Sequence, residues 1–223
     1  MKRLMAALTA AGLVACGASA QTITSVNSVG FHSVDVPPGG DLVLVAPTLE
    51  SMGGGTLEEL IGDQLPAGAI AHIWQRDTRS YTTVPKSSKN GWGSATIERG
   101  DAVWLLDPNA TTTQRVSFAG EVPDVRSLTA TTTVSIGAID AVAYPYPTEI
   151  DFTNTTLAQA SVPGDVVHFW RTADQAYTTV PKSSKNGWGS SSTKVLAIGE
   201  AFWYQPLDGS EDWVEVIKYD LSN

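Results

Sequence analysis

The sequence YTTVPKSSKNGWGS occupies residues 81–94 and returns unchanged at residues 177–190, an offset of 96 positions. The two copies also have related neighbours on both sides, although with small differences in spacing. The matching neighbours are His72 and Trp74 with His168 and Trp170, Thr56–Leu60 with Thr156–Ala160, and Gly100–Trp104 with Gly199–Trp203. The chain is therefore an internal duplication.

The length of the repeat selects among architectures. Solenoid and propeller repeats run to about 20–50 residues and need three or more copies. Two copies of nearly 100 residues instead predict a first β-repeat at 21–123 and a second at 124–223, behind a leader at 1–20. The connection at 120–129 contains no flexible Gly/Ser run, so we expect the two repeats to pack against each other.

Within each repeat, short apolar or alternating segments end at Gly, Pro, Asp or Asn, which is typical of strands. They are Asp41–Pro47, Ala69–Trp74, Ala102–Leu106 and Arg115–Phe118, then Thr131–Gly137, Asp140–Tyr144, Val166–Arg171, Ala201–Tyr204 and Val214–Lys218. Only the segments beginning at Thr56 and Thr156 look helical, each about one turn after a threonine cap. The pattern predicts an all-β protein of paired or pseudo-symmetric sandwich or barrel units, each with at most one short helix.

The first 20 residues have the pattern of an export signal. Lys2 and Arg3 precede the apolar stretch Leu4–Ala15, and a small-residue site ends at Ala20. We expect cleavage there and location in the periplasm, on the outer surface or outside the cell. Residues 13–16, Leu-Val-Ala-Cys, also fit a lipobox, so the alternative is lipidation of Cys16 and an outer-membrane lipoprotein.

Composition excludes several classes of protein. The chain carries 14 basic and 23 acidic residues, and removal of the signal leaves a net charge of −11. Nucleic-acid binding needs positive charge against the phosphates, so no nucleic-acid partner is expected. The longest apolar stretch has 12 residues, too few for a transmembrane helix. Oligomeric state does not follow from the sequence.

The repeated segment is the candidate ligand site. An aromatic face beside lysine and amide donors suits stacking on a sugar ring and bonding to its hydroxyl or acidic groups. The residues proposed for an acidic or neutral polysaccharide are Tyr81, Lys86, Lys89, Asn90, Trp92, Tyr177, Lys182, Lys185, Asn186 and Trp188. Basic residues also gather in and near the two copies, with Arg76, Arg79, Arg171 and Lys194 beside the four lysines.

A packing interpretation competes with the ligand site and is favoured. Truncating a buried tryptophan costs about 3–5 kcal/mol, more than weak surface stacking returns, so most of the seven tryptophans are expected in the core. Asn90-Gly91 predicts a two-residue type I′ turn, in which both residues have positive φ. His72 and His168 lack a third ligand and are expected to pack rather than to bind a metal.

The chain resembles an uncharacterised family of exported proteins from planctomycete- and verrucomicrobial-type bacteria. The resemblance rests on short Gly/Trp motifs, namely Thr24–Phe31, Trp74, Gly91-Trp92-Gly93, Gly100–Trp104 and Val116–Pro123. It implies export and a β-rich fold. It implies no activity and assigns no functional residue.

Three functions follow as hypotheses. The first is a non-catalytic protein of the cell envelope or extracellular matrix, structural or adhesive. The alternative is a carbohydrate-binding module that uses the two repeated segments. The third is a polysaccharide hydrolase, because a catalytic carboxylate pair leaves no signature in sequence. No nucleophile elbow, zinc-protease motif or phosphate-binding loop is present, and no catalytic residue, metal or cofactor is predicted.

Overall fold

A computed structural model describes residues 28–124, 130–189 and 194–219. It confirms the all-β class, since the described residues form many short strands and two α-helices of four and five residues. The signal sequence, with Ala20 and Cys16, lies outside the described residues. We call residues 28–124 the first half and residues 130–219 the second half.

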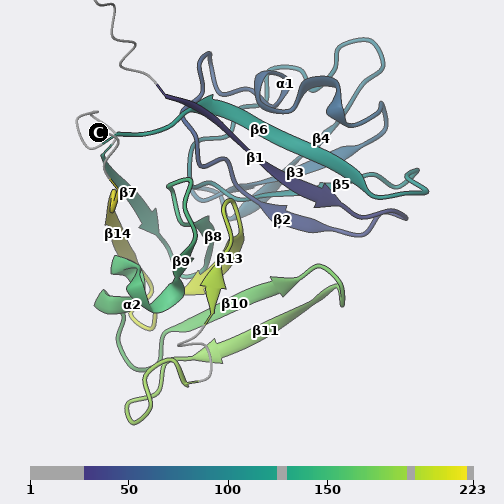
Figure 1. The fold of residues 1–223 in the computed structure, drawn as a ribbon. Helices are drawn as coiled ribbons and strands as arrows, with labels where there is room; N and C mark the ends of the chain where they lie inside the picture. The colour runs from purple at the N-terminus through teal and green to yellow at the C-terminus, as the bar shows by residue number, and fades with distance from the viewer. Residues whose placement is uncertain (1–27, 125–129, 190–193, 220–223) are drawn as a thin grey trace, which may run out of the picture.

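The elements of the first half are β1 (Val29–Val36), β2 (Val43–Val45), α1 (Leu57–Leu60), the 3₁₀ turn η1 (Gly62–Gln64), β3 (Ile70–Gln75), β4 (Ser80–Pro85), β5 (Val103–Leu106) and β6 (Gln114–Glu121). Those of the second half are β7 (Thr131–Ile136), β8 (Asp140–Ala143), β9 (Ile150–Asp151), η2 (Phe152–Asn154), α2 (Thr156–Ala160), β10 (Val166–Arg171), β11 (Ala176–Pro181), β12 (Val195–Leu196), β13 (Ala201–Gln205) and β14 (Glu211–Val216). Figure 1 shows the first half, in purple to teal, above the second half, in green to yellow.

Each half contains one four-stranded antiparallel sheet and one long two-stranded sheet. The first sheet has the order β2-β5-β3-β4 and the second sheet β8-β13-β10-β11, while β1 pairs with β6 and β7 pairs with β14. Corresponding residues also have corresponding partners, because Trp74 lies opposite Tyr81 and Trp170 lies opposite Tyr177. The repeated segment therefore begins on an edge strand, β4 or β11, in both sheets.

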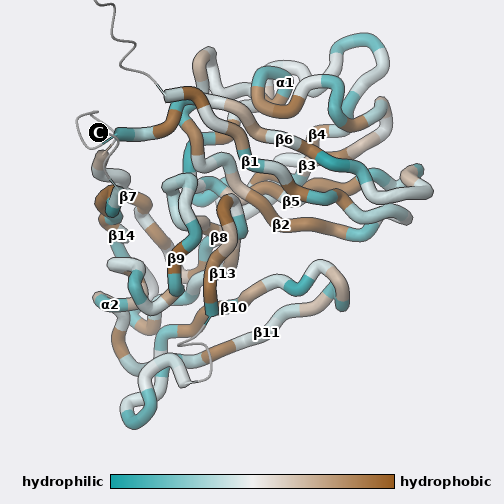
Figure 2. The backbone as a smooth tube through the Cα atoms, viewed as in Figure 1, coloured by the Kyte–Doolittle hydropathy of each residue, from teal (hydrophilic) through white to brown (hydrophobic). Residues whose placement is uncertain are grey.

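Strand alternation divides the interior into three layers. In β2, Val43 and Val45 face a core under the β1–β6 pair and α1, whereas Leu44 faces the second sheet. In β13, Phe202 and Tyr204 face the equivalent core of the second half, and Trp203 faces the first sheet. Successive side chains of a strand point to opposite faces, so each sheet is apolar on both sides. Figure 2 shows the resulting apolar colour along the inner strands.

The two sheets contact each other through small side chains. Alanines occupy much of the shared layer, at positions 46, 102, 141, 143 and 201. Backbone hydrogen bonds cross between the halves, since Ala46 N–H donates to the Gly199 carbonyl (3.0 Å) and Ala143 N–H donates to the Gly100 carbonyl (3.1 Å). Short side chains permit this close approach, and the halves are consequently packed together.

The two helical turns begin at positions of the repeat that differ by one residue. Thr56 caps α1 as predicted and forms a capping box with Glu59. The cap of α2 is Thr155, whose hydroxyl accepts from Ala158 N–H, and Thr156 is the first helical residue. The predicted cap at Thr156 is therefore wrong by one residue. The hydroxyl of the buried Thr155 also donates to the Phe152 carbonyl, which holds the capping side chain in place.

The predicted type I′ turn at Asn90-Gly91 is wrong. Gly91 has φ 55°, but Asn90 does not have a positive φ, since Arg79 and Gln175 are the non-glycine residues with positive φ in the described part of the chain. Ser87 and Gly91 instead exchange two backbone hydrogen bonds around a three-residue loop. The Ser87 hydroxyl accepts from Lys89 N–H and Asn90 N–H, which stabilises that loop without a second positive φ.

Candidate functional site

Lys86 of the repeated segment is buried at a helix end. Only 6% of the residue is exposed, and its Nζ donates to the Gly62 and Leu65 carbonyls and to Asp63 Oδ1 at 2.9, 2.7 and 2.8 Å. These carbonyls lie in the 3₁₀ turn η1 and directly after it, at the end of the helical segment that begins with α1. A cation is favoured beside such groups, so the lysine stabilises the end of the helical turn.

Lys182 occupies the same place in the second half. Its Nζ donates to the Ala158 and Ser161 carbonyls and lies 2.7 Å from the Ser161 hydroxyl. The ammonium also lies 5.8 Å from the centre of the Trp188 ring. Both lysines of this type therefore bind backbone oxygen of their own chain.

The two tryptophans of the repeated segment complete the same arrangement. Trp92 and Trp188 are 2% and 4% exposed, in agreement with the packing interpretation. Trp92 Nε1–H donates to the Gly62 carbonyl at 3.0 Å, and Trp188 Nε1–H donates to the Ala158 carbonyl at 3.3 Å. In each half one carbonyl oxygen accepts from both the lysine and the tryptophan, and neither indole offers a face to a ligand.

The loop between these residues is exposed. Lys89, Asn90, Lys185 and Asn186 lie at its tips, away from the buried lysine and tryptophan. Most nearby cations are paired within the chain, because Arg76 binds Asp101, Arg171 binds Asp174 and Lys194 binds Glu200. The structure thus separates the ten proposed ligand residues into lysines and tryptophans held at the helical turns, an exposed loop and the two strand tyrosines.

Tyr81 and Tyr177 lie in a groove that residues of both four-stranded sheets line. The groove has a volume of about 420 Å³, and Tyr81 and Tyr177 are 43% and 42% exposed. We call it the aromatic groove, and its lining residues are Leu42, His72, Tyr81, Trp104, Trp170 and Tyr177. The site combines both halves of the chain.

The aromatic rings of the groove support one another. Trp104 contacts Trp170 edge to face at 4.9 Å between ring centres, and Trp170 contacts Tyr177 at 4.9 Å. Trp104 Nε1–H donates to the Tyr81 hydroxyl at 3.0 Å, and Trp170 Nε1–H donates to the Leu42 carbonyl at 3.0 Å. Both indoles are thereby fixed by contacts that cross from strand to strand.

Sequence reasoning missed Leu42, Trp104 and Trp170 as groove residues, because it treated these tryptophans only as core. The signal was present in strand alternation. His72 and Trp74 lie on one face of β3, so the hairpin partner Tyr81 lies on that face too. The pairing of the two sheets, which places Trp170 beside Trp104, follows from tertiary packing alone.

Ionisable groups in the groove are neutral near pH 7. Burial lowers the pKa of His72, whose Nδ1 lies 2.9 Å from the Thr83 hydroxyl. Burial raises the pKa of Tyr81 and raises that of Tyr177 to about 12. His168 makes the matching contact with Thr179 at 2.8 Å, so both histidines are held by a cross-strand threonine, as the packing interpretation expects.

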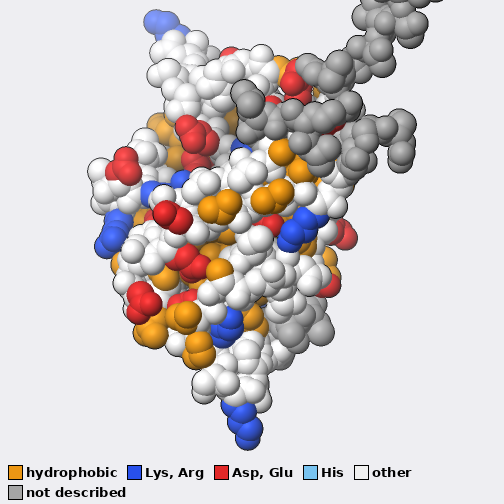
Figure 3. All heavy atoms as spheres, turned by 90° about the vertical axis from the view of Figure 1, so that its left-hand side faces the viewer, with side chains coloured by type: hydrophobic (Ala, Val, Ile, Leu, Met, Phe, Trp, Pro, Cys, Tyr) orange, Lys and Arg blue, Asp and Glu red, His pale blue; other side chains and the backbone are white. Residues whose placement is uncertain are grey.

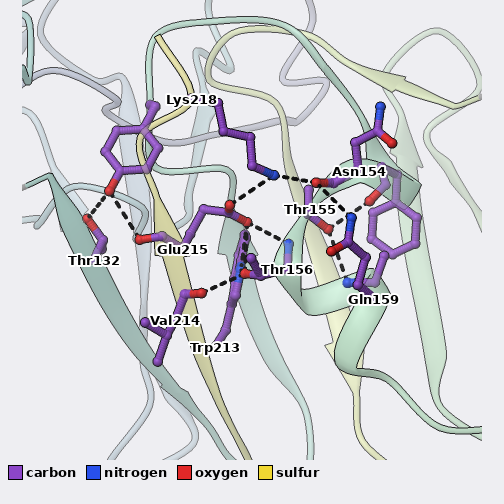
Figure 4. A network of polar contacts seen from close by, with 12 residues as sticks. Thr132, Asn154, Thr155, Thr156, Gln159, Trp213, Val214, Glu215 and Lys218 are labelled. Atoms are coloured by element: carbon purple, nitrogen blue, oxygen red, sulfur yellow. Dashed lines mark hydrogen bonds and ion pairs between the residues drawn. The ribbon is translucent and has the colours of Figure 1, made fainter. Parts of the chain in front are cut away.

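A buried carboxylate in the second half is also structural (Figure 4). Glu215 is 1% exposed, and its Oε2 accepts from Thr156 N–H and Trp213 Nε1–H at 2.8 and 3.1 Å. Lys218 Nζ lies 3.2 Å from Oε1 and also donates to the Asn154 carbonyl. Glu215 therefore joins β14 to the start of α2 and satisfies its polar neighbours.

A second hollow, of about 620 Å³, lies beside loop 50–55 and Thr131–Thr133. Arg99 in its wall donates to the Thr132 hydroxyl at 2.7 Å and pairs with Glu50 at 3.4 Å. Its guanidinium also lies 5.1 Å from the centre of the Tyr146 ring. Arg99 and Glu50 thus bind each other in the wall of this hollow.

Across the described ranges, no group of three or more His, Cys, Asp or Glu side chains has metal-binding geometry. In the same ranges no helix has the length and apolar character needed to cross a bilayer. Figure 3 shows one face on which acidic, basic and apolar side chains are interspersed. Comparison of the chain with protein-family models, curated proteins and solved structures gave no match.

Proposed function

We propose that this protein is a non-catalytic, exported component of the cell envelope or extracellular matrix with a structural or adhesive role. The observation that carries the proposal is that the repeated segment binds groups of its own chain. Its first lysine and its tryptophan bind the same carbonyl oxygen in each half, Gly62 in one and Ala158 in the other. The identical residues therefore serve to build two stable copies of one unit.

The packing of the sheets supports a scaffolding role. Trp74 and Trp203 meet edge to face at 4.9 Å between ring centres, as do Trp104 and Trp170. Trp74 Nε1–H also reaches across to Asp140 Oδ1 at 2.6 Å. Aromatic pairs of this kind contribute about 0.5–1.5 kcal/mol each beyond burial, so the two halves hold one another without a disulfide in the described part of the chain.

Co-sedimentation tests this function. The purified protein is added to washed envelope and matrix fractions of the source cells, which are then pelleted, and the supernatant is assayed for released sugar. We expect the protein in the pellet and no time-dependent release of reducing ends. Retention in the supernatant contradicts the adhesive role, and steady release of sugar supports the hydrolase hypothesis instead.

The mass of the exported product tests its location and attachment. Cleavage after Ala20 gives a chain that starts at Gln21, whereas the lipoprotein alternative gives a chain that starts at a lipidated Cys16. We expect the former, recovered from the periplasmic or extracellular fraction. A protein found unprocessed in the cytoplasm contradicts export.

A further inference from the structure

The aromatic groove presents two rings that are already fixed in place. Tyr81 and Tyr177 each lie near the start of an edge strand, so among the described residues no further strand of either sheet lies beside them. Each ring rests on the tryptophan opposite it in the hairpin, with 5.1 Å between the centres of Tyr81 and Trp74 and 4.9 Å between those of Tyr177 and Trp170. A ligand that stacks here therefore orders few side chains, which lowers the entropic cost of binding.

The lining of the groove selects against charge. None of its six residues is Asp, Glu, Lys or Arg, and His72 is neutral because burial lowers its pKa. An ionic group placed against these rings loses water without gaining a counter-charge, which is costly. The groove thus favours a neutral ligand over the acidic one.

The groove also contains polar atoms beside its ring faces. The Tyr81 hydroxyl accepts from Trp104 Nε1–H, so its own hydrogen is free to point outward. The Tyr177 hydroxyl remains protonated, with a pKa of about 12, and is a second donor. A ligand with flat C–H faces and hydroxyl groups at its edge matches this pattern, whereas a hydrocarbon chain leaves the hydroxyls unused.

We propose that the aromatic groove binds a neutral glycan chain, with sugar rings stacked on Tyr81 and Tyr177. The inference rests on the proposed function, since it gives the adhesive role a ligand. It moves the sugar contact from the tryptophans of the repeated segment, which are buried, to the tyrosines at its start. Because each half supplies one tyrosine, the chain needs both halves to form the site.

Calorimetric titration with defined hexasaccharides tests the proposal. The neutral probes are cellohexaose, xylohexaose, mannohexaose and chitohexaose, and the comparison probes are hexagalacturonate and phosphatidylcholine vesicles. We expect at least one neutral hexasaccharide to bind. The Tyr81→Ala/Tyr177→Ala protein is expected to bind it about 10-fold or more weakly, because two stacked rings are lost.

Matched variants separate stacking from folding. Phe31→Ala removes a 76% exposed ring outside the groove and is expected to leave the affinity unchanged. If the alanine variant unfolds, the Tyr81→Phe/Tyr177→Phe protein takes its place, because phenylalanine retains the packing. Its affinity for the hexasaccharide is expected to be about 2–5-fold lower, because the two hydroxyls are missing.

Three results overturn the inference: no neutral probe binds, the bound probe binds the alanine variant equally well, or only hexagalacturonate or vesicles bind. These results are independent of the envelope assay. If the alanine variant still pellets with washed envelopes, the adhesive role stands while the groove is rejected as its site.

Discussion

Lys86 and Trp92 donate to the same oxygen atom, the Gly62 carbonyl, at 2.9 and 3.0 Å. The pair recurs as Lys182 and Trp188 on the Ala158 carbonyl. Between the lysine and the tryptophan, the Ser87–Gly91 loop returns the chain so that both side chains reach one acceptor. This geometry gives a physical reason for the identity of the two copies. A change in loop length or in either donor removes a hydrogen bond from the shared carbonyl oxygen.

Lys86→Met is accordingly expected to lower the free energy of unfolding by about 2 kcal/mol. Methionine fills most of the same space but leaves the Gly62 and Leu65 carbonyls without their ammonium donor. Equilibrium urea unfolding measures the loss. Lys89→Met, in the exposed loop of the same segment, is the control and is expected to change stability by less than about 0.5 kcal/mol. Equal effects of the two substitutions contradict the capping role.

Acid is expected to destabilise the protein through His32. Burial lowers its pKa from 6.5 to about 4, and its ring stacks on Phe118 with 5.0 Å between centres. The folded state thus binds the proton less readily than the unfolded state. The stability is complete above about pH 6.5 and is lost as the pH falls toward 4, by about 3 kcal/mol for this residue.

Urea unfolding of wild type and His32→Gln at pH 7 and pH 4 isolates this contribution. Carboxylates affect both proteins alike, so the difference between the two pH values is expected to be about 3 kcal/mol smaller in the variant. The comparison does not depend on how much the substitution itself destabilises the fold. The same pH dependence in both proteins rules out a buried neutral His32.

The interface between the halves makes a glycine indispensable at position 199. Gly199 has φ 76°, and a Cβ there would lie 2.6 Å from His32 Nε2 and 3.0 Å from the Ala46 carbonyl oxygen. Gly199→Ala is expected to destabilise by about 3 kcal/mol, through backbone strain and the displaced contact together. Thermal unfolding followed by circular dichroism measures this change.

Gly209→Ala is the matched control for that measurement. Gly209 has φ 81°, close to that of Gly199, but no described atom outside its chain neighbours lies within 4 Å of the position that a Cβ would take. Only the strain of the left-handed conformation is expected, about 1 kcal/mol. A loss at Gly199 no larger than that at Gly209 contradicts the tight contact between the halves.

Strand alternation allowed the class and most strands to be predicted from sequence, since runs such as Ala69–Trp74 and Ala102–Leu106 are short and bounded by turn residues. The duplication likewise indicated which tryptophans occupy equivalent positions in the two halves. The groove was not predictable in this way. It depends on how Trp104 meets Trp170 across two sheets, and pairing of faces is a property of the packed molecule.

The type I′ prediction for Asn90-Gly91 was wrong for a local reason. The dipeptide favours a tight hairpin, but here the Ser87 hydroxyl accepts from two backbone N–H groups and supports a longer loop. The need for Lys86 and Trp92 to meet at one carbonyl also favours that loop length. The contacts around the loop, and not the Asn90-Gly91 dipeptide, thus set its length and conformation.

Glu215 is expected to be the most sensitive carboxylate of the second half. Glu215→Leu leaves Thr156 N–H without its acceptor and leaves Trp213 Nε1–H with only the Thr156 hydroxyl, at a cost of about 2–3 kcal/mol in this buried place. Glu215→Gln retains one acceptor oxygen and is expected to cost about half as much. Asp212→Asn, on the same strand but exposed, is the control and is expected to change the free energy of unfolding by less than about 0.5 kcal/mol. Urea unfolding ranks the three variants. If Glu215→Leu is as stable as wild type, the carboxylate does not join β14 to α2, and its burial then points to a role outside the scaffold.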